Sequence, residues 1–406
     1  MKKLRVGITG AAGQVGSVIV QTLSGNPGIE TVAVCRNLLS AGVIHSLAPG
    51  CDIRIGSLAR PKEAGQLLGD CDTVVNCALA MVSARPRESR EQNLAIGLGL
   101  LELPKLSVLI HLSSIAVYGG SIDAARYRRR KDAFGFPRPD NDYGRSKLAV
   151  ERRVARRAGE KNISCYILRL GHVIGAHTDR SRAILMDAAN PAFRLPFEGK
   201  LPSNTIRVGH LAAMIEALVH GKVPSGVYDV AEPSRTWREV FDWHTRSTGL
   251  PDVGGLDDAS SRSLKQEYRS RSVVRDGFGW LASLSPTDLL FRPSMFELVF
   301  RVLALTPATY IDAMARWFKR RQTRQKLAAL TGFDSRGIAP AYYSDPMPGK
   351  QLQHAIRMAP KDQDHESAEM KQWHRRYADI QWLPQSILDS CRPDDPAVLL
   401  QRRIPA

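Results

Sequence analysis

The chain has 406 residues, of which 43% are hydrophobic and 24% charged, and its formal net charge is +17. The apolar fraction is ordinary for a soluble globular protein, and the length exceeds the usual size of one domain but falls short of three. The six cysteines, at positions 35, 51, 71, 77, 165 and 391, form no C-x-x-C pair, so we expect a reducing compartment rather than a disulfide scaffold.

Neither end of the sequence carries the pattern of a targeting or spanning segment. The N terminus runs from MKKLR into a short apolar segment, whereas a signal peptide needs a longer one. The run from Val302 to Ile311 is about half of the ~20 residues that a bilayer span requires. We therefore expect a cytoplasmic location, with contact at a membrane surface as a further possibility.

Six short apolar runs alternate with helix-like stretches over residues 1–175. They are LRVGITG (4–10), TVAVC (31–35), DIRI (52–55), DTVVNCA (72–78), SVLIHLS (107–113) and ISCYILRL (163–170). Buried strands separated by helices predict an α/β fold, a doubly wound parallel sheet covered on both faces.

The remaining sequence divides into two parts of different character. Residues 176–263 combine a loop-rich stretch, the helical HLAAMIEALVHG and a strand-like GVYDV, and predict a small substrate lobe. Residues 264–406 predict a largely helical C-terminal region of unknown role. Within it, residues 291–326 mix aromatics and arginines, which fits either a basic helix on a membrane surface or a packed helix pair broken at Pro307.

A glycine turn follows the first predicted strand at residues 10–16, GAAGQVG. Gly10 permits a sharp turn, Gly13 lets the backbone approach a pyrophosphate, and Gly16 lets helix and strand pack closely. The start of the next helix offers unpaired N–H groups to phosphates. Strand, turn and helix together predict a Rossmann-type dinucleotide site. Arg36, after the second strand, suits a 2′-phosphate and favours NADP over NAD.

A candidate catalytic group follows the fifth predicted strand. Ser114 closes that strand, and Tyr143 and Lys147 stand four residues apart, so they share one face of a helix. A phenol exchanges protons poorly at neutral pH unless a neighbouring ammonium lowers its pKa. The pattern therefore indicates proton transfer by Tyr143, assisted by Lys147, with the serine orienting a substrate oxygen.

The order TGAAGQVG, DTVVNCALA, HLSSIAVYG, YGRSK and LRLGHVIG resembles the extended short-chain dehydrogenase/reductases, the NAD-dependent epimerase/dehydratase group, over residues 4–250. The resemblance implies a catalytic triad of Ser114, Tyr143 and Lys147. The residues that it implies for the dinucleotide, with the triad's Tyr143 and Lys147, are Gly10, Ala12, Gly13, Gln14, Val15, Gly16, Arg36, Ser57, Leu58, Ala78, Leu79, Ala80 and Asn93.

The sequence also departs from that family. The third strand ends near Ser57 where the family usually has an aspartate, and Ile115-Ala116 replaces the acidic pair of dehydratases, which disfavours dehydration. Arg128, in an unusually basic loop, and Arg207 are candidate contacts for an anionic substrate. The histidines show no metal-ligand spacing, so we expect no metal.

Three functions remain open from the sequence alone. The first is an NAD(P)-dependent oxidoreductase or epimerase acting on a secondary alcohol or ketone of a nucleotide sugar. The second is a reductase or dehydrogenase of a hydrophobic alcohol, steroid- or flavonoid-like, at a membrane surface. The third is a dinucleotide-binding regulatory or structural protein without turnover. We expect a homodimer and no specific nucleic-acid partner, because no recognised reader motif accompanies the arginines.

Overall fold

The computed structural model describes residues 3–79, 86–119, 137, 139, 142–176, 178–190, 193–221, 223–232, 235–263, 342, 347, 350–356 and 368–371. Seven parallel strands form its main sheet, in the order β3-β2-β1-β4-β5-β6-β9. They are β1 (Leu4–Thr9), β2 (Ile29–Cys35), β3 (Asp52–Ile55), β4 (Thr73–Asn76), β5 (Val108–Ser114), β6 (Ser164–Leu170) and β9 (Gly226–Val230). The six predicted strands and the doubly wound α/β fold are confirmed.

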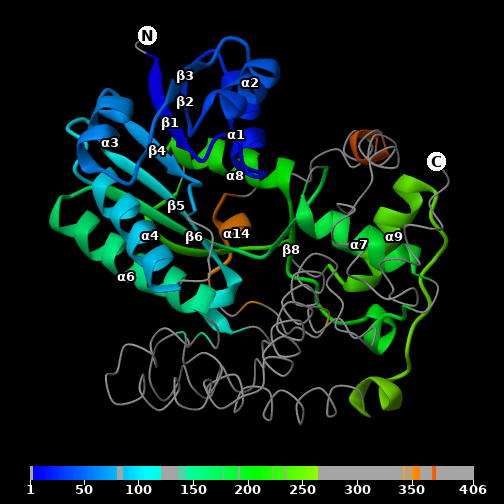
Figure 1. Cartoon of the computed structure of the whole chain (residues 1–406). Helices are drawn as coiled ribbons and strands as arrows, with labels where there is room; N and C mark the ends of the chain where they lie inside the picture. The colour runs from blue at the N-terminus through cyan, green and yellow to red at the C-terminus, as the bar shows by residue number, and fades with distance from the viewer. Residues whose placement is uncertain are drawn as a thin grey trace, which may run out of the picture.

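Helices cover both faces of this sheet, because its strands are apolar on both sides. One face packs against α1 (Gly16–Ser24), α2 (Leu38–Leu47) and α8 (Val208–Val219). The other packs against α3 (Pro61–Leu68), α4 (Pro86–Leu100) and α6 (Asp142–Glu160). Figure 1 shows α4 and α6 side by side in front of the sheet and α1 behind it. Two separate apolar cores result, one on each face.

The topology creates a ligand crevice at the carboxyl edge of the sheet. β1 lies between β2 and β4, with Thr9 opposite Asn76 in the β1–β4 register. The chain leaves β1 toward β2, on one side, and leaves β4 toward β5, on the other side of the sheet. The loops that follow β1 and β4 therefore diverge. Ligands of open α/β sheets bind at such a switch point.

A smaller lobe stands beside the carboxyl edge, to the right in Figure 1. It contains β7 (His172–Ile174) paired in parallel with β8 (Thr205–Arg207), together with α7 (Asp179–Ala189), η2 (Pro196–Gly199) and α9 (Trp237–Thr248). The rings of Phe193, Trp237, Phe241 and Tyr342 pack against one another in its core. Tyr342 comes from the C-terminal part of the chain.

The structure differs in one respect from the simple division at residue 175. Two elements from the range 176–263 join the main domain: β9 pairs with β6, and α8 packs against α1. The reason is apolar burial, since β9 ends in the buried run Tyr228–Val230 and nine of the twelve residues of α8 are buried. The small lobe is therefore made of the segment between β6 and β9, apart from α8, together with α9 and Tyr342, which follow β9 in the chain. The predicted domain boundaries stay predictions.

Only a short part of the C-terminal region is described. α14 (Leu352–Ile356) packs on α8 and β9 (Figure 1). The basic segment at 291–326, predicted to contact a membrane surface, lies outside the described residues. Within the described part of the chain, no helix combines the length and apolar character needed to cross a bilayer.

Candidate functional site

The glycine turn has the geometry of a phosphate cradle. Gly10 has φ +61°, and a Cβ there would lie 2.9 Å from the backbone nitrogen of Ala78. A Cβ on Gly16 would lie 2.2 Å from the carbonyl oxygen of Gly10, so only glycine lets α1 start against the turn. α1 begins with no side-chain cap on Val15 and no acidic residue in its first turn. Its partial positive charge is thus available to an anion, and these residues fit a dinucleotide.

The other residues predicted for the dinucleotide follow the strands at the same edge. Arg36 is exposed directly after β2, and Gln14 in the glycine turn accepts a hydrogen bond at Oε1 from the backbone N–H of Asp179 (3.2 Å), at the start of α7. Asn93 is buried on α4. The remaining described ones follow β1, β3 or β4, namely Ala12, Gly13, Ser57, Leu58, Ala78 and Leu79. Ala80 and the candidate substrate residue Arg128 lie outside the described residues.

The three predicted catalytic residues come together beside this crevice. Ser114 ends β5, and its Oγ accepts a hydrogen bond from the backbone N–H of Ala116 (3.2 Å). Its side chain also lies near enough to the Tyr143 hydroxyl to act on the pKa of that phenol. Tyr143 stands in the first turn of α6, and Lys147 one turn further. The Nζ atom of Lys147 donates to the carbonyl oxygen of Leu112 (2.9 Å) and lies 6.0 Å from the centroid of the Tyr143 ring.

Gly144 allows α6 to bring Tyr143 close to Ser114. A Cβ at this position would lie 2.2 Å from the carbonyl oxygen of Ala116, in η1 (Ile115–Tyr118). Any side chain would therefore push the first turn of α6 away from η1. Further along the same helix, a Cβ added to Gly159 would meet no atom within 4 Å, so glycine is not required at that position.

Burial perturbs both ionisable members of the group. It lowers the pKa of Lys147 from 10.5 to about 8, although Cys77 and Glu151 act in the opposite direction. Burial also raises the pKa of the Tyr143 phenol, and the hydrogen bond with Ser114 opposes that rise. Perturbed titratable groups in a crevice are typical of functional sites.

A row of buried hydrogen bonds runs beneath the crevice across β1, β4 and β5. The Ala78 N–H donates to Thr9 Oγ1 (3.1 Å), so the Thr9 hydroxyl donates to Asn76 Oδ1 (2.7 Å). The amide group of Asn76 then donates to Nδ1 of His111 (3.0 Å). Because an amide nitrogen only donates, Nδ1 of His111 accepts here, which makes His111 the neutral Nε2–H tautomer. Burial and nearby Lys147 agree with this, lowering the pKa of His111 to about 3.

A second buried network joins the strands that flank the catalytic group. Glu151 on α6 accepts from the Ser113 hydroxyl and forms an ion pair with Arg169 (2.8 Å). Arg169 also donates to the Tyr118 hydroxyl (2.9 Å), which in turn donates to Asp229 (2.7 Å). Sequence reasoning did not single out Asn76, Glu151 or Asp229 as site residues. For Asn76 and Asp229 the sequence did offer a signal, because each is a polar residue within an apolar, buried strand.

Arg207, the other candidate substrate contact, lies buried at the end of β8. Its Nε atom is 2.6 Å from Glu232 Oε1, and Arg235 pairs with the other carboxylate oxygen (3.1 Å). Burial would raise the pKa of Glu232, but the nearby His210 ring (Nδ1 to Oε1, 3.5 Å) and the positive charges of Arg235 and Arg207 hold it at about 2. One carboxylate therefore faces two guanidinium groups, and the role of Arg207 toward substrate stays a prediction.

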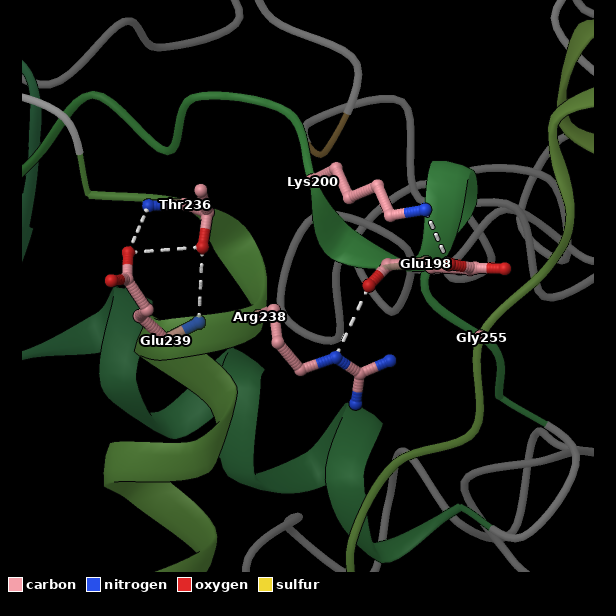
Figure 2. A pocket seen from close by; sticks show the side chains of 6 residues that line it. All are labelled: Glu198, Lys200, Thr236, Arg238, Glu239 and Gly255. Atoms are coloured by element: carbon pink, nitrogen blue, oxygen red, sulfur yellow. Dashed lines mark hydrogen bonds and ion pairs between the residues drawn. The ribbon is translucent and has the colours of Figure 1, made fainter.

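A second hollow, of about 650 Å³, lies on the small lobe away from the catalytic group. Figure 2 shows its lining residues, Glu198, Lys200, Thr236, Arg238, Glu239 and Gly255. Lys200 pairs with Glu198 (2.6 Å), and Thr236 and Glu239 form a reciprocal cap at the start of α9. Arg238 donates to the backbone carbonyl oxygens of Glu198 (3.1 Å) and Val253 (2.6 Å). The charged groups of the hollow thus have partners within the protein, and the hollow contains none of the predicted site residues. Across the described ranges, no three His, Cys, Asp or Glu side chains are grouped to hold a metal ion.

Comparison with known proteins agrees with this geometry. Residues 6–193 match the model of the NAD dependent epimerase/dehydratase family. A curated relative, the dTDP-6-deoxy-L-talose 4-dehydrogenase (NAD(P)(+)) of Kitasatospora kifunensis, is 26% identical over 297 residues, which cover 68% of this chain and 90% of the relative.

Solved structures show the same fold. The UDP-glucose 4-epimerase of Thermotoga maritima, solved with UDP-glucose, is 18% identical with a TM-score of 0.50, and the match covers 63% of this chain and 86% of that one. The UDP-N-acetylglucosamine 4-epimerase of Methanobrevibacter ruminantium, in complex with UDP-N-acetylmuramic acid, is 21% identical with a TM-score of 0.50, over 64% and 86%. At these identities the likeness concerns the fold alone.

Proposed function

We propose that the chain, an NAD(P)-dependent enzyme of the extended short-chain dehydrogenase type, acts on a secondary alcohol or ketone of a nucleotide sugar. The match of residues 6–193 to the NAD-dependent epimerase/dehydratase family supports this proposal. The catalytic residues of this proposal are Ser114, Tyr143 and Lys147. One observation carries it: the three side chains meet at the carboxyl edge of the sheet that also bears the glycine turn.

Each residue has a chemical role that its position supports. Tyr143 takes the proton of the substrate hydroxyl when the carbon is oxidised and returns a proton when a ketone is reduced. Ser114 orients that oxygen through a hydrogen bond. Lys147, whose Nζ lies 6.0 Å from the centroid of the Tyr143 ring, would hold the ribose next to the nicotinamide and would attract the phenolate that forms when Tyr143 gives up its proton. When bound, the nicotinamide ring supplies the hydride acceptor or donor.

The dinucleotide would be held by the glycine turn, the start of α1 and the residues that follow β2, β3 and β4. We propose NADP rather than NAD, because Arg36 is exposed at the end of β2, where a 2′-phosphate could form a charge-assisted pair with it. The curated relative carries both cofactors in its name.

The substrate class follows from relatives whose names specify nucleotide sugars. The curated relative is a dTDP-sugar dehydrogenase, and the solved structure from Thermotoga maritima contains UDP-glucose. The two guanidinium groups around Glu232 lie beyond the end of β9, at the same edge of the sheet as Ser114, and favour an anionic substrate. A homodimer, a cytoplasmic location and a membrane contact through residues 264–406 remain part of the proposal.

The direct test is a substrate screen with the purified full chain. The protein is incubated with NAD⁺ or NADP⁺ and a panel of UDP- and dTDP-sugars, and reduced nicotinamide and sugar products are followed by absorbance and NMR. We expect oxidation or epimerisation of a sugar hydroxyl. Turnover of hydrophobic alcohols alone would instead identify a reductase or dehydrogenase of hydrophobic alcohols. Dinucleotide binding without any turnover would contradict the proposal that the protein is a catalyst.

A further inference from the structure

The C-terminal part of the chain reaches both lobes through a few well-placed residues. We refer to Tyr342, Met347 and residues 350–356 as the C-terminal strap. Tyr342 lies in the aromatic core of the small lobe, with its ring centroid 4.6 Å from that of Trp237, and its hydroxyl donates to Asp187. Leu352, at the start of α14, is fully buried in the core of the main domain.

The strap is also joined to the sheet by backbone hydrogen bonds. The Asp229 N–H donates to the carbonyl oxygen of Lys350 (2.8 Å), and Gln351 forms a parallel bridge with the same residue of β9. The strap thus extends the sheet beyond β9 at one point. Between its two anchored ends lies Met347, whose backbone N–H donates to Oδ1 of Asn204 (3.2 Å), just before β8.

Met347 is buried in a small apolar cluster next to the catalytic group. The cluster consists of Ile115, Val117, Tyr118, Leu148, Ala231 and Met347. The first three form most of η1, which directly follows Ser114, and Leu148 directly follows Lys147 on α6. The cluster therefore closes the junction between the element that ends in the serine and the helix that carries the tyrosine and the lysine.

We propose that Met347 is a positioning residue for the catalytic group: the C-terminal strap inserts it at the junction of η1 and α6 and so holds Ser114 against Tyr143. The inference rests on the proposed function, since the role is defined through these two residues. It assigns a task in the active site to a part of the chain that lies outside the family match at residues 6–193.

Physical reasoning gives the size of the effect. Removing the thioether side chain of Met347 would leave a cavity between η1 and α6. Because protein interiors are closely packed, such a cavity lowers stability and lets the neighbouring elements shift. A small shift of either element changes the contact between Ser114 and Tyr143, and misplacement of about 1 Å costs roughly 100-fold in rate. Leucine has a similar volume, so Met347→Leu should keep the junction closed.

The test compares Met347→Ala with Met347→Leu and with Leu68→Ala, a truncation of a fully buried side chain on α3 that lies outside the strap, in the core on the other face of the sheet. Turnover is measured well below the thermal midpoint. In addition, the pKa of Tyr143 is followed in all variants through its ring-carbon NMR resonance, assigned with Tyr143→Phe. We expect Met347→Ala and Leu68→Ala both to lower Tm, but only Met347→Ala to reduce kcat about 10- to 100-fold and to shift the Tyr143 pKa toward its ordinary value.

Met347→Leu should restore both quantities. If Met347→Ala has the kcat and the Tyr143 pKa of the wild type, or if Leu68→Ala changes them equally, Met347 has no specific positioning role. The two proposals fail separately. A wild-type protein without turnover contradicts the proposed function, while the NMR titration still decides whether Met347 holds the junction.

Discussion

Lys147 donates a hydrogen bond from Nζ to the carbonyl oxygen of Leu112, 2.9 Å away, two residues before Ser114 on the same strand. This bond ties α6 to the end of β5. It also explains how a buried ammonium is kept at a fixed place while burial lowers its pKa to about 8. The packing of α6 on the sheet therefore determines both the position of the Lys147 ammonium and its lowered pKa.

The lowered pKa predicts a specific pH dependence of stability. Below about pH 8 Lys147 is charged in both the folded and the unfolded chain, and its burial costs stability. Between about 8 and 10.5 the folded chain is neutral at this site while the unfolded chain still binds the proton, so this site's contribution rises with pH. Lys147→Met removes that contribution. Its Tm relative to the wild type should therefore be most favourable near pH 7 and decline toward pH 10, and a constant difference would contradict the pKa.

The close approach of α6 to η1 predicts opposite effects for two glycines of one helix. Gly144→Ala places a methyl group against the Ala116 carbonyl and should lower both Tm and kcat by moving Tyr143. Gly159→Ala meets no neighbour and should leave kcat unchanged while stabilising the helix by up to about 1 kcal/mol. Thermal unfolding and turnover of both variants check this, and equal behaviour of the pair would refute the proposed contact.

Arg36 predicts the choice of dinucleotide. Arg36→Asp should weaken binding of NADP relative to NAD by about 10- to 100-fold, because a charge-assisted hydrogen bond is lost and a repulsive charge gained. Calorimetric titration with each dinucleotide measures the ratio. Arg156→Asp, at an exposed site on α6, serves as the charge-matched control. An unchanged ratio in Arg36→Asp would show that this arginine does not read the 2′-phosphate.

Asp187 predicts a second pH effect, located in the small lobe. Burial raises its pKa to about 8, although the hydrogen bond from Tyr342 and the charge of Arg180 oppose the rise. Between 3.8 and about 8 the unfolded chain loses this proton while the folded chain keeps it, so stability falls across that window. Asp187→Asn should remove this part of the slope and raise Tm most at pH 8. Equal slopes of Tm against pH in the two proteins would exclude it.

Most of the fold was predictable because its signals are local. Apolar runs marked all six predicted strands, and the glycine turn and the Tyr143–Lys147 spacing indicated the edge at which they meet. The place of β9 was not predictable in this way, because GVYDV has the same local pattern in a separate lobe as at the edge of the main sheet. The contacts of Met347 could not be predicted from local patterns either, because its cluster partners in η1 and α6 are some 200 residues distant in the sequence.

The chemistry of the phenol at position 143 is the central claim, and one substitution tests it. Tyr143→Phe keeps the ring and removes the hydroxyl that exchanges the proton, whereas Tyr166→Phe removes a hydroxyl bonded to the Val223 carbonyl, remote from the site. Turnover and dinucleotide affinity are measured for both. The account predicts about 100- to 10,000-fold lower kcat for Tyr143→Phe with dinucleotide binding retained, and wild-type turnover for Tyr166→Phe. Wild-type turnover in Tyr143→Phe would contradict the account.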